Sequence, residues 1–370
     1  MVNLPPPIYP EHILDEAAYG QITYDPDIEW PGISIVTPSY QQGPYIETTI
    51  RSILLQGYPK LQYFVMDGGS KDQTVEILKY YDAFIDGWVS EKDRGQSEAI
   101  NKGLKQCTQP IFNWINSDDW LLPGALYTIG KTFATTGADM VASRANIWQE
   151  GEILWVNGYT PKKEDVIESA LMTGLNQQGL FLRTDKFQQI GGVDEVYHYS
   201  MDMDMWVRYL LTYGQDKFEV IDDVTAVFRF HPECKSVMEG WAEGSASDKE
   251  TKSMRRRLVA TLNDPRYAPV VDYVFPNPRL DICDLPPHSP IDPKVVGTWI
   301  NRILFRKMKR AFYGNENEVA RQIAPGIDPA YLPEKDAKDF QAFSRYLQRT
   351  KGSLGPVWRL VYGFKKLTGS

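Results

Sequence analysis

Four β-rich runs alternate with three segments of helical periodicity between residues 33 and 115, and this alternation is the feature that most constrains the fold. The runs are 33–38, 61–66, 84–89 and 110–115, and the helical segments are 44–57, 72–81 and 96–106. Apolar residues recur every three or four positions in the helical segments, whereas the runs are short and end at turn residues. We therefore predict an α/β fold with a mainly parallel central sheet flanked by helices and joined by right-handed crossovers.

Polar loops follow the four predicted strands. They contain Pro38-Ser39-Tyr40, Asp67-Gly68-Gly69-Ser70, Asp93-Arg94-Gly95 and Asp118-Asp119. Ligands bind beyond the carboxyl ends of the strands in sheets of this kind, so we expect these loops to converge on one site. The chain has neither a G-x-G-x-x-G sequence nor a G-x-x-x-x-G-K-[ST] loop, which argues against a dinucleotide-binding Rossmann site and a P-loop.

Two adjacent acids, Asp118 and Asp119, end the fourth hydrophobic run. Carboxylates repel each other, and a neighbouring cation offsets that repulsion. A hard divalent metal that carries phosphate oxygens is the cation that best suits such a pair. The acid pair therefore favours chemistry on a diphosphate.

The composition narrows the class of protein. The chain has 370 residues and a net charge of -8, which argues against a general nucleic-acid binder. Its three cysteines are widely spaced, which indicates a reducing compartment and no disulfide framework. No signal peptide or apolar run of membrane-spanning length is apparent. We expect a cytoplasmic protein, either free or peripheral at the inner face of the plasma membrane.

Two segments near the carboxyl end combine basic and aromatic residues, 296–312 and 356–367. One interpretation is peripheral contact with an anionic membrane. The alternative is a pair of amphipathic helices that pack on the catalytic domain or on a second subunit of an oligomer.

Several motifs, taken together and in order, resemble those of family 2 glycosyltransferases. They are Ser34-Ile35-Val36-Thr37-Pro38-Ser39-Tyr40, Asp67-Gly68-Gly69-Ser70-Lys71-Asp72, Ser90–Gly103 and Asn116-Ser117-Asp118-Asp119. The resemblance covers about residues 32–235. It implies the GT-A fold, with a Rossmann-like nucleotide-binding half and an acceptor half. It also implies transfer of a sugar from a nucleotide-diphosphate donor with Mn²⁺ or Mg²⁺, usually with inversion at the anomeric carbon.

The resemblance assigns roles in the donor half. Donor-binding residues are Pro38, Ser39, Tyr40, Asp67, Asp93, Arg94, Gly95 and Asp118. Within this set Asp67 corresponds to the residue that contacts the base, and Arg94 is expected near the diphosphate. Metal ligands are Asp119, Asp118 and His231, with Asp119 favoured as the direct ligand. Asn116 stands where many relatives have the first acid of a D-x-D pattern, so the division of roles between Asp118 and Asp119 stays open.

The acceptor half carries a second acidic segment, Met201–Arg208, which resembles the family's E-D-x-D-x-W-x-R sequence. Asp202 matches the general base of the family, and Met201 replaces its common glutamate. Asp204, Trp206 and Gln178 are assigned to the acceptor, and Gln177 is a further candidate for sugar contacts. The segment from Arg229 through His231 to Lys235 resembles a family sequence found near the diphosphate.

The predicted organisation has three parts. An arm, 1–31, precedes a catalytic domain, 32–240, whose nucleotide-sugar half is 32–125 and whose acceptor half is 126–240. Residues 241–370 form a connector and a basic, helical extension. The predicted activity is metal-dependent, inverting transfer from a nucleotide-diphosphate sugar, with a UDP-sugar favoured, to a saccharide or lipid-linked acceptor. The alternatives are a sugar nucleotidyltransferase and a non-catalytic saccharide-binding module.

Overall fold

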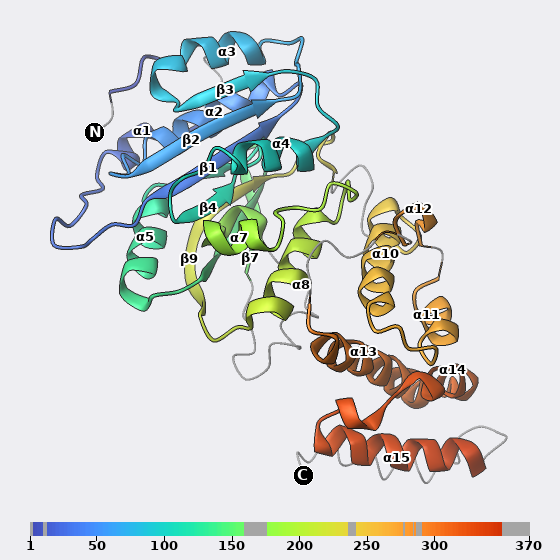
Figure 1. The fold of residues 1–370 in the computed structure, drawn as a ribbon. Coiled ribbons are helices and arrows are strands. Elements are labelled where there is room, and N and C mark those ends of the chain that lie inside the picture. The colour runs from blue at the N-terminus through green and yellow to red at the C-terminus, as the bar shows by residue number, and fades with distance from the viewer. Residues whose placement is uncertain are drawn as a thin grey trace. The chain divides into compact units, whose positions relative to one another are not determined.

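The computed structural model describes residues 3–9, 13–158, 176–235, 242–276, 278–283, 285 and 291–349. Two compact units are present, Met1–Asp248 with 288–290 and Lys249–Pro287 with Ile291–Ser370. The helices and strands of the first unit are drawn in Figure 1. They are α1 Glu16–Tyr19, β1 Ile33–Ser39, α2 Gly43–Leu54, β2 Leu61–Asp67, α3 Thr74–Tyr80, β3 Gly87–Ser90, α4 Gln96–Leu104, β4 Ile111–Trp114, β5 Trp120–Leu121, α5 Ala125–Thr136, β6 Met140–Gln149, β7 Glu152–Asn157, β8 Leu180–Arg183, α7 Thr184–Gln189, α8 Met201–Tyr213 and β9 Phe218–Arg229.

One sheet of nine strands runs through the described part of the first unit, in the order β3-β2-β1-β4-β8-β6-β9-β5, with β7 paired to β6. The pairs among β3, β2, β1 and β4 are all parallel, as predicted for this half. In the other half, β8 is antiparallel to both β4 and β6, and β6 is parallel to β9. The sheet is therefore mixed rather than mainly parallel, because the second half returns through hairpins and a long crossover.

The central strand β1 is buried on both faces. Ile33 and Ile35 belong to the same core cluster as Ile46 and Ile50 of α2. Val36, on the opposite face, meets α4 at Gly103, where a side-chain Cβ would lie 2.5 Å from a methyl carbon of Val36. Helices thus cover both faces, and the close approach of α4 depends on a glycine.

The amino-terminal arm is bound to α2 through a buried acid and base. The carboxylate of Glu47 accepts hydrogen bonds from the backbone N–H groups of Ile8 and Tyr9, at 2.7 and 3.0 Å. Arg51 donates to the carbonyl of Pro5 and forms an ion pair with Glu16. The arm lacks sequence periodicity, yet these contacts fix it to the domain because its backbone donors have side-chain partners.

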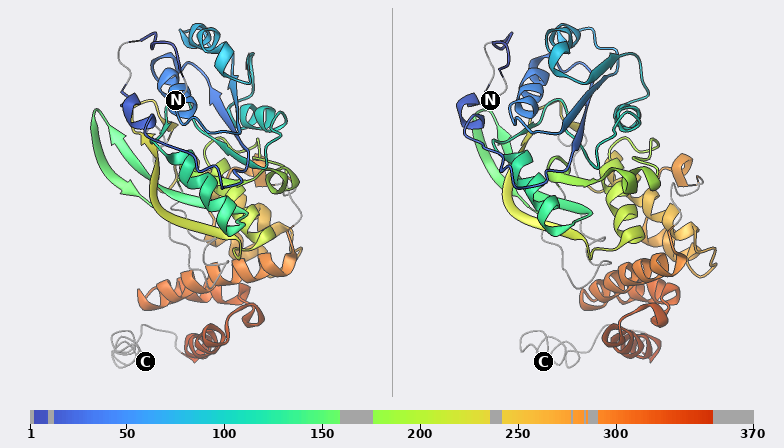
Figure 2. Two further views of the ribbon diagram at one scale, coloured as in Figure 1. Left: turned by 90° about the vertical axis from the view of Figure 1, so that its left-hand side faces the viewer. Right: turned by 60° about the vertical axis from the view of Figure 1, so that its left-hand side comes forward.

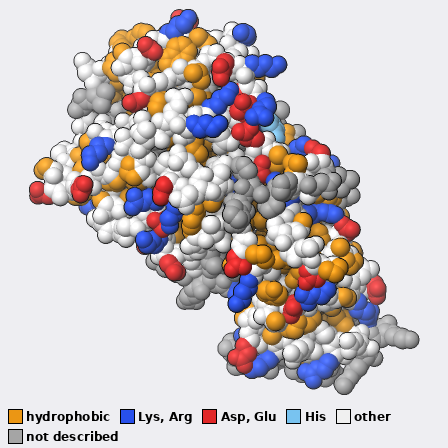
Figure 3. All heavy atoms as spheres, viewed as in Figure 1, with side chains coloured by type: hydrophobic (Ala, Val, Ile, Leu, Met, Phe, Trp, Pro, Cys, Tyr) orange, Lys and Arg blue, Asp and Glu red, His pale blue; other side chains and the backbone are white. Residues whose placement is uncertain are grey.

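Strand β7 pairs with residues 145–149 of β6, and the two form a hairpin beside β9 that Figure 2 shows. On the face of the first unit that carries α4, basic and acidic side chains are interspersed (Figure 3), and they include the ion pairs of Lys102 with Glu91 and Glu98.

The second unit is helical in its described residues. Its elements are α10 Ala246–Ala260, which begins within the first unit, α11 Ala268–Val274, α12 Leu280–Cys283, α13 Pro293–Tyr313, α14 Asn317–Ile323 and α15 Glu334–Arg349. Much of the predicted connector, 241–290, is therefore helical. Helix α10 is rich in charged residues, so the sequence did not indicate its buried face, which includes Met254 and Leu258.

The basic segment 296–312 lies in α13, and its apolar residues are buried inside this unit. Phe312 contacts Phe343 of α15 with ring centroids 4.5 Å apart, and Phe305 contacts the same ring at 6.3 Å. Helices of the same unit therefore cover rings of α13, a partner that the sequence did not predict. The segment 356–367 lies outside the described residues.

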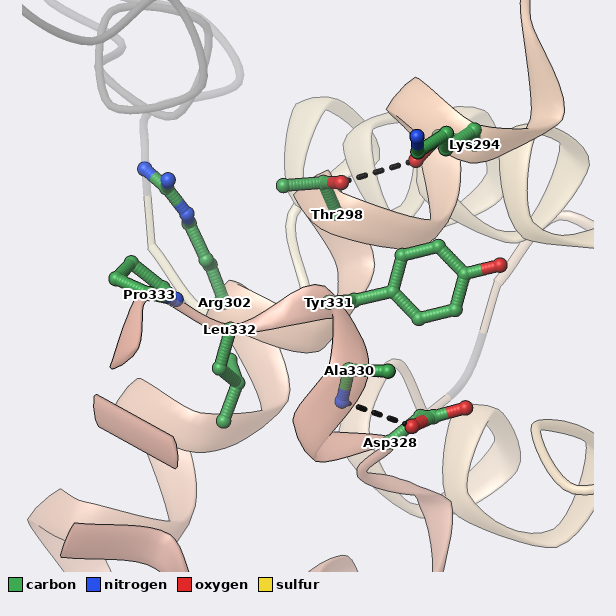
Figure 4. A pocket seen from close by; sticks show the side chains of 8 residues that line it. All are labelled: Lys294, Thr298, Arg302, Asp328, Ala330, Tyr331, Leu332 and Pro333. Atoms are coloured by element: carbon green, nitrogen blue, oxygen red, sulfur yellow. Dashed lines mark hydrogen bonds between the residues drawn. The ribbon is translucent and has the colours of Figure 1, made fainter. Parts of the chain in front are cut away.

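A shallow hollow of about 650 Å³ lies on the second unit between α13 and the turn before α15 (Figure 4). It is lined by Lys294, Thr298, Arg302, Asp328, Ala330, Tyr331, Leu332 and Pro333. Within the described ranges, no helix combines the length and the apolar character that a bilayer crossing requires.

Candidate active site

A cavity of about 1120 Å³ lies at the carboxyl ends of the parallel strands and extends beneath the second half of the sheet. It brings together many of the residues predicted from the sequence, namely Pro38, Ser39, Tyr40, Asp93, Gly95, Asp118, Gln177, Gln178 and Asp202. These residues come from both halves of the domain. The loops after β1, β3 and β4 and the start of α8 therefore share one solvent-filled space.

Asp118 lines this cavity and pairs with His231, which follows β9. The Nε2 atom of His231 lies 3.0 Å from Oδ2 of Asp118, and the imidazole ring is 4.7 Å from that of Tyr45. The Nδ1 atom of His231 is buried and has no hydrogen-bond partner among the described residues. A carboxylate oxygen and an imidazole nitrogen at one point suit Mn²⁺.

This pair supplies two ligands, not a complete shell. In the described parts of the chain, no three His, Cys, Asp or Glu side chains gather closely enough to hold a metal together. A divalent cation that binds diphosphate oxygens and water needs only one or two protein carboxylates, so the residues present fit such an ion when a nucleotide diphosphate is also bound.

Asp119, favoured from the sequence as the direct ligand, is placed differently. Its carboxylate is fully buried and accepts hydrogen bonds from the backbone N–H of Arg229 at 3.0 Å, from Gln178 Nε2 at 2.7 Å and from Asn116 Nδ2 at 3.2 Å. Burial, reinforced by the charge of Asp118, raises the pKa of Asp119 well above its ordinary value. Asp119 therefore fixes the turn, and Asp118 is the acid that faces the cavity.

Arg229 holds the same turn from β9. Its Nε atom donates to the backbone carbonyl of Asp118 at 2.8 Å. The guanidinium lies over the rings of Tyr45, Trp120 and Trp148, at 4.9, 4.9 and 5.2 Å from their centroids. The planar guanidinium stacks on the rings and donates in one fixed direction, which an ammonium group does not reproduce. Arg229 is thus a positioning residue for Asp118.

We expect Arg229→Lys to weaken Mn²⁺-dependent nucleotide binding by about 10- to 100-fold, the range typical of residues that orient a metal ligand. Isothermal titration of UDP at several Mn²⁺ concentrations measures the effect. Arg144→Lys is the matched control, because Arg144 lies on β6 and pairs with exposed Asp222. Equal Mn²⁺ dependence in the two variants would contradict the positioning role.

Asp67 and Asp93 differ in how their carboxylates are used. Asp67 is buried and accepts from the backbone N–H of Gly69, from the backbone and hydroxyl of Ser70 and from the hydroxyl of Ser90. Its oxygens stabilise the loop and the end of β3. Asp93 lines the cavity, where Oδ1 accepts from the Gly95 N–H at 2.9 Å, and burial raises the pKa of its carboxyl.

Arg94, predicted near the diphosphate, points to solvent with 75% of its side chain exposed and binds Glu98 and Glu195. The cations that line the cavity are Lys71, Lys92 and Lys235. Lys235 donates to Gln96 Oε1 at 2.9 Å and to the carbonyl of His198 at 3.1 Å. Lys235 belongs to the sequence motif that contains His231, so the sequence indicates a role for it. The sequence gives no separate indication of the role of Gln96.

Asp202 lies in the first turn of α8 and lines the cavity. Its Oδ1 atom accepts from the backbone N–H of Met203 at 2.7 Å. Burial raises the pKa of Asp202, while that N–H and the charge of Lys235 act in the opposite direction. The carboxylate is therefore a stronger base than an exposed aspartate.

Asp204 and Trp206, predicted at the acceptor, are buried and do not line the cavity. Asp204 pairs with Arg208 at 2.7 Å, and Arg208 also donates to the carbonyls of Ile190 and Gly192. Trp206 packs edge-on against Phe218 at 5.1 Å. Both residues anchor the helix, and Asp204 points away from Asp202 because side chains two positions apart on a helix point in different directions.

Gln177 and Gln178 precede β8, and their side chains have different hydrogen-bond partners. Gln178 donates to Asp119, so it supports the acid pair. The amide nitrogen of Gln177 donates to Asn113 Oδ1 and the Trp114 carbonyl, at 2.9 and 2.7 Å. Its oxygen, Oε1, is buried beside the cavity without a hydrogen-bond partner among the described residues. Gln177 therefore connects this part of the cavity wall to β4.

The parallel half of the sheet, the mixed second half and the cavity at the strand ends define the GT-A fold. The crystal structure of S. aureus TarS residues 1–349 in complex with UDP-GlcNAc has the same fold, with a TM-score of 0.53 and 12% identity over 86% of this chain and 89% of that one.

Residues 34–201 match the model of glycosyl transferase family 2, and this domain of the chain belongs to that family. An uncharacterized glycosyltransferase of Rickettsia prowazekii, RP339, is 28% identical over 188 residues, which are 48% of this chain and 58% of the relative. The putative teichuronic acid biosynthesis glycosyltransferase TuaG of Bacillus subtilis is 35% identical over 92 residues, 24% of this chain and 36% of the relative. The chain thus spans little more than half the length of the Rickettsia relative.

Proposed function

We propose that the protein transfers a sugar from a nucleotide-diphosphate donor, a UDP-sugar, to a hydroxyl group of a saccharide or lipid-linked acceptor during polysaccharide or glycoconjugate synthesis. The observation that carries this proposal is one cavity lined by the nucleotide-side loops, Asp118 and Asp202, with His231 bonded to Asp118. The UDP-GlcNAc complex of TarS supports the choice of donor, and the name of TuaG supports the choice of pathway.

The donor occupies the half of the cavity formed by the β1, β2 and β3 loops. Tyr40 covers the base, and Asp93 accepts a base or ribose hydrogen through its cavity-facing oxygen. Lys71, Lys92 and Lys235 balance the charge of the diphosphate. Asp118 and His231 would hold the divalent metal, which would neutralise charge on the leaving diphosphate.

Asp202 accepts the proton of the acceptor hydroxyl. The hydroxyl oxygen forms a bond to the anomeric carbon as the bond from that carbon to the diphosphate oxygen breaks, and the nucleoside diphosphate leaves with the bonding electrons. Because Asp202 and the diphosphate site come from different halves of the domain, we infer attack from the face opposite the leaving group, which inverts the configuration.

The pH dependence of turnover follows from the raised pKa of Asp202. A general base works in its ionised form, so kcat falls as the pH drops through that pKa. We expect the acidic limb to lie above 4, the ordinary region for aspartate. Measuring kcat against pH at saturating donor tests this, and the residual activity of Asp202→Asn should lack the limb. A limb that persists in this variant would assign it to another group.

Thermal stabilisation distinguishes the proposal from its rivals. A protein that binds a ligand only when folded gains stability as the ligand exceeds its Kd. UDP-sugars with Mn²⁺ should raise the melting temperature more than either component alone. Stabilisation by a nucleoside triphosphate and a sugar phosphate would favour a nucleotidyltransferase, and stabilisation by saccharides alone would favour a non-catalytic binding module.

Membrane contact stays a prediction that now depends on residues 356–367, because the apolar face of α13 is buried. Flotation of the full chain with anionic liposomes tests it.

A further inference from the structure

Strand β7 exposes four consecutive apolar residues. Ile153, Leu154, Trp155 and Val156 keep between 44% and 57% of their surface exposed. Exposed apolar groups of this density are typical of interaction sites in proteins. Only Trp155 among these four lines the cavity that contains Asp202.

The register of the hairpin explains why Trp155 faces the cavity. Trp155 pairs with Ile147, and Ile153 pairs with Trp148, so the register shifts and Leu154 has no opposite residue on β6. An extra residue of this kind is a β-bulge, which changes the direction of the neighbouring side chains. Bulges are common beside active sites. Ile147 in turn pairs with Phe228 of β9. Trp155, Ile147 and Phe228 thus form one row across three strands, and all three line the cavity.

We propose that this row, which we call the Trp155 shelf, binds the acceptor saccharide by stacking on the indole of Trp155. The inference rests on the proposed glycosyl transfer and names the part of the site that receives the acceptor. A pyranose ring has an apolar face of C–H groups and a rim of hydroxyl groups. An exposed indole suits that face, and side-chain amides suit the rim.

The surroundings of the shelf match a saccharide. Asn157 and Asn176 line the cavity next to the shelf. Their side chains bond to each other at 2.6 Å, and Asn176 also donates to the carbonyl of Asn157 at 2.7 Å, so their amides are held in place. Gln177, which follows directly in the chain, also lines the cavity.

The Trp155 shelf and the proposed donor site lie in different parts of the sheet. Strands β7, β6 and β9 belong to the mixed half, whereas the nucleotide-side loops follow the parallel strands. On the nucleotide side, Tyr40 lines the same cavity with 61% of its surface exposed. The cavity therefore has an exposed aromatic side chain in each half, and Asp202 lines the same space.

The test compares Trp155→Ala, Trp155→Phe and Leu154→Ala. Leu154 is the matched control because it is an exposed neighbour on the same strand that does not line the cavity. Saturation-transfer NMR with a panel of methyl glycosides and short oligosaccharides, in the presence of UDP and Mn²⁺, measures saccharide binding. Titration of UDP with Mn²⁺ measures the donor side separately.

We expect Trp155→Ala to weaken glycoside binding by about tenfold or more, the scale of one lost aromatic contact with its buried area. Trp155→Phe should retain part of the affinity, and Leu154→Ala should match the wild type. UDP binding should be the same in all four proteins. Equal glycoside affinity in Trp155→Ala and wild type, or no glycoside binding to the wild type, would overturn the shelf while leaving the donor site intact. Absence of UDP binding in the wild type would overturn the proposed function and the shelf with it.

Discussion

Asp118→Asn is expected to reduce sugar transfer by about a thousandfold or more. Asp118 is the acid that faces the cavity and lies 3.0 Å from His231. Stabilising the charge of the leaving diphosphate through a metal contributes several kcal/mol to the transition state, and each 1.36 kcal/mol changes the rate about tenfold. Asparagine keeps the shape of the side chain but removes the charge, so the variant should retain the fold.

The neighbouring acid provides a direct contrast. Asp119→Asn replaces a buried carboxylate that accepts three hydrogen bonds, so we expect a lower melting temperature as its main effect. Asp222→Asn, at an exposed position on β9, should change neither stability nor activity. Full Mn²⁺-dependent turnover in Asp118→Asn would show that the cavity-facing acid is not a ligand of the metal.

Asp202→Asn is expected to lower kcat by about 10²- to 10⁴-fold, the contribution typical of a general base. The affinity for UDP with Mn²⁺ should stay at the wild-type value, since the proposed donor site lies in the other half of the domain. Steady-state kinetics with donor and acceptor, together with titration of UDP, separate the two effects.

The control for this variant is Asp216→Asn, an exposed acid just beyond the end of α8. Its kcat should equal that of the wild type. A kcat for Asp202→Asn within a few fold of the wild type would contradict the assignment of Asp202 as the base. A different group in the cavity would then have to accept the proton.

The sequence allowed prediction of the order of strands and helices up to β4, because hydrophobic periodicity and turn residues are local signals. It also allowed prediction of the loops that line the cavity. The difference between Asp118 and Asp119 could not be predicted, because it depends on Arg229 and Gln178. These residues reach Asp119 through strand pairing across a separation of 110 and 59 positions.

Burial and packing also distinguish residues of α8 and α13 whose roles the sequence pattern left open. Asp202 and Asp204 share one acidic segment, yet only the second has Arg208 as a buried partner. In α13, a pattern of basic and aromatic residues was compatible with a membrane surface, and α15 instead contacts its aromatic rings. Amphipathic periodicity indicates that a face is covered but does not identify what covers it.

We propose that this cavity transfers a sugar from a nucleotide diphosphate with help from a metal that Asp118 and His231 would hold. A panel of nucleotide sugars assayed for release of nucleoside diphosphate, with Mn²⁺ and with a chelator, tests it most directly. We predict release from a UDP-sugar in the presence of Mn²⁺, at least a thousandfold less in Asp118→Asn, and background release with the chelator. Background release from every nucleotide sugar in the presence of Mn²⁺, or equal release by wild type and Asp118→Asn, would contradict the claim.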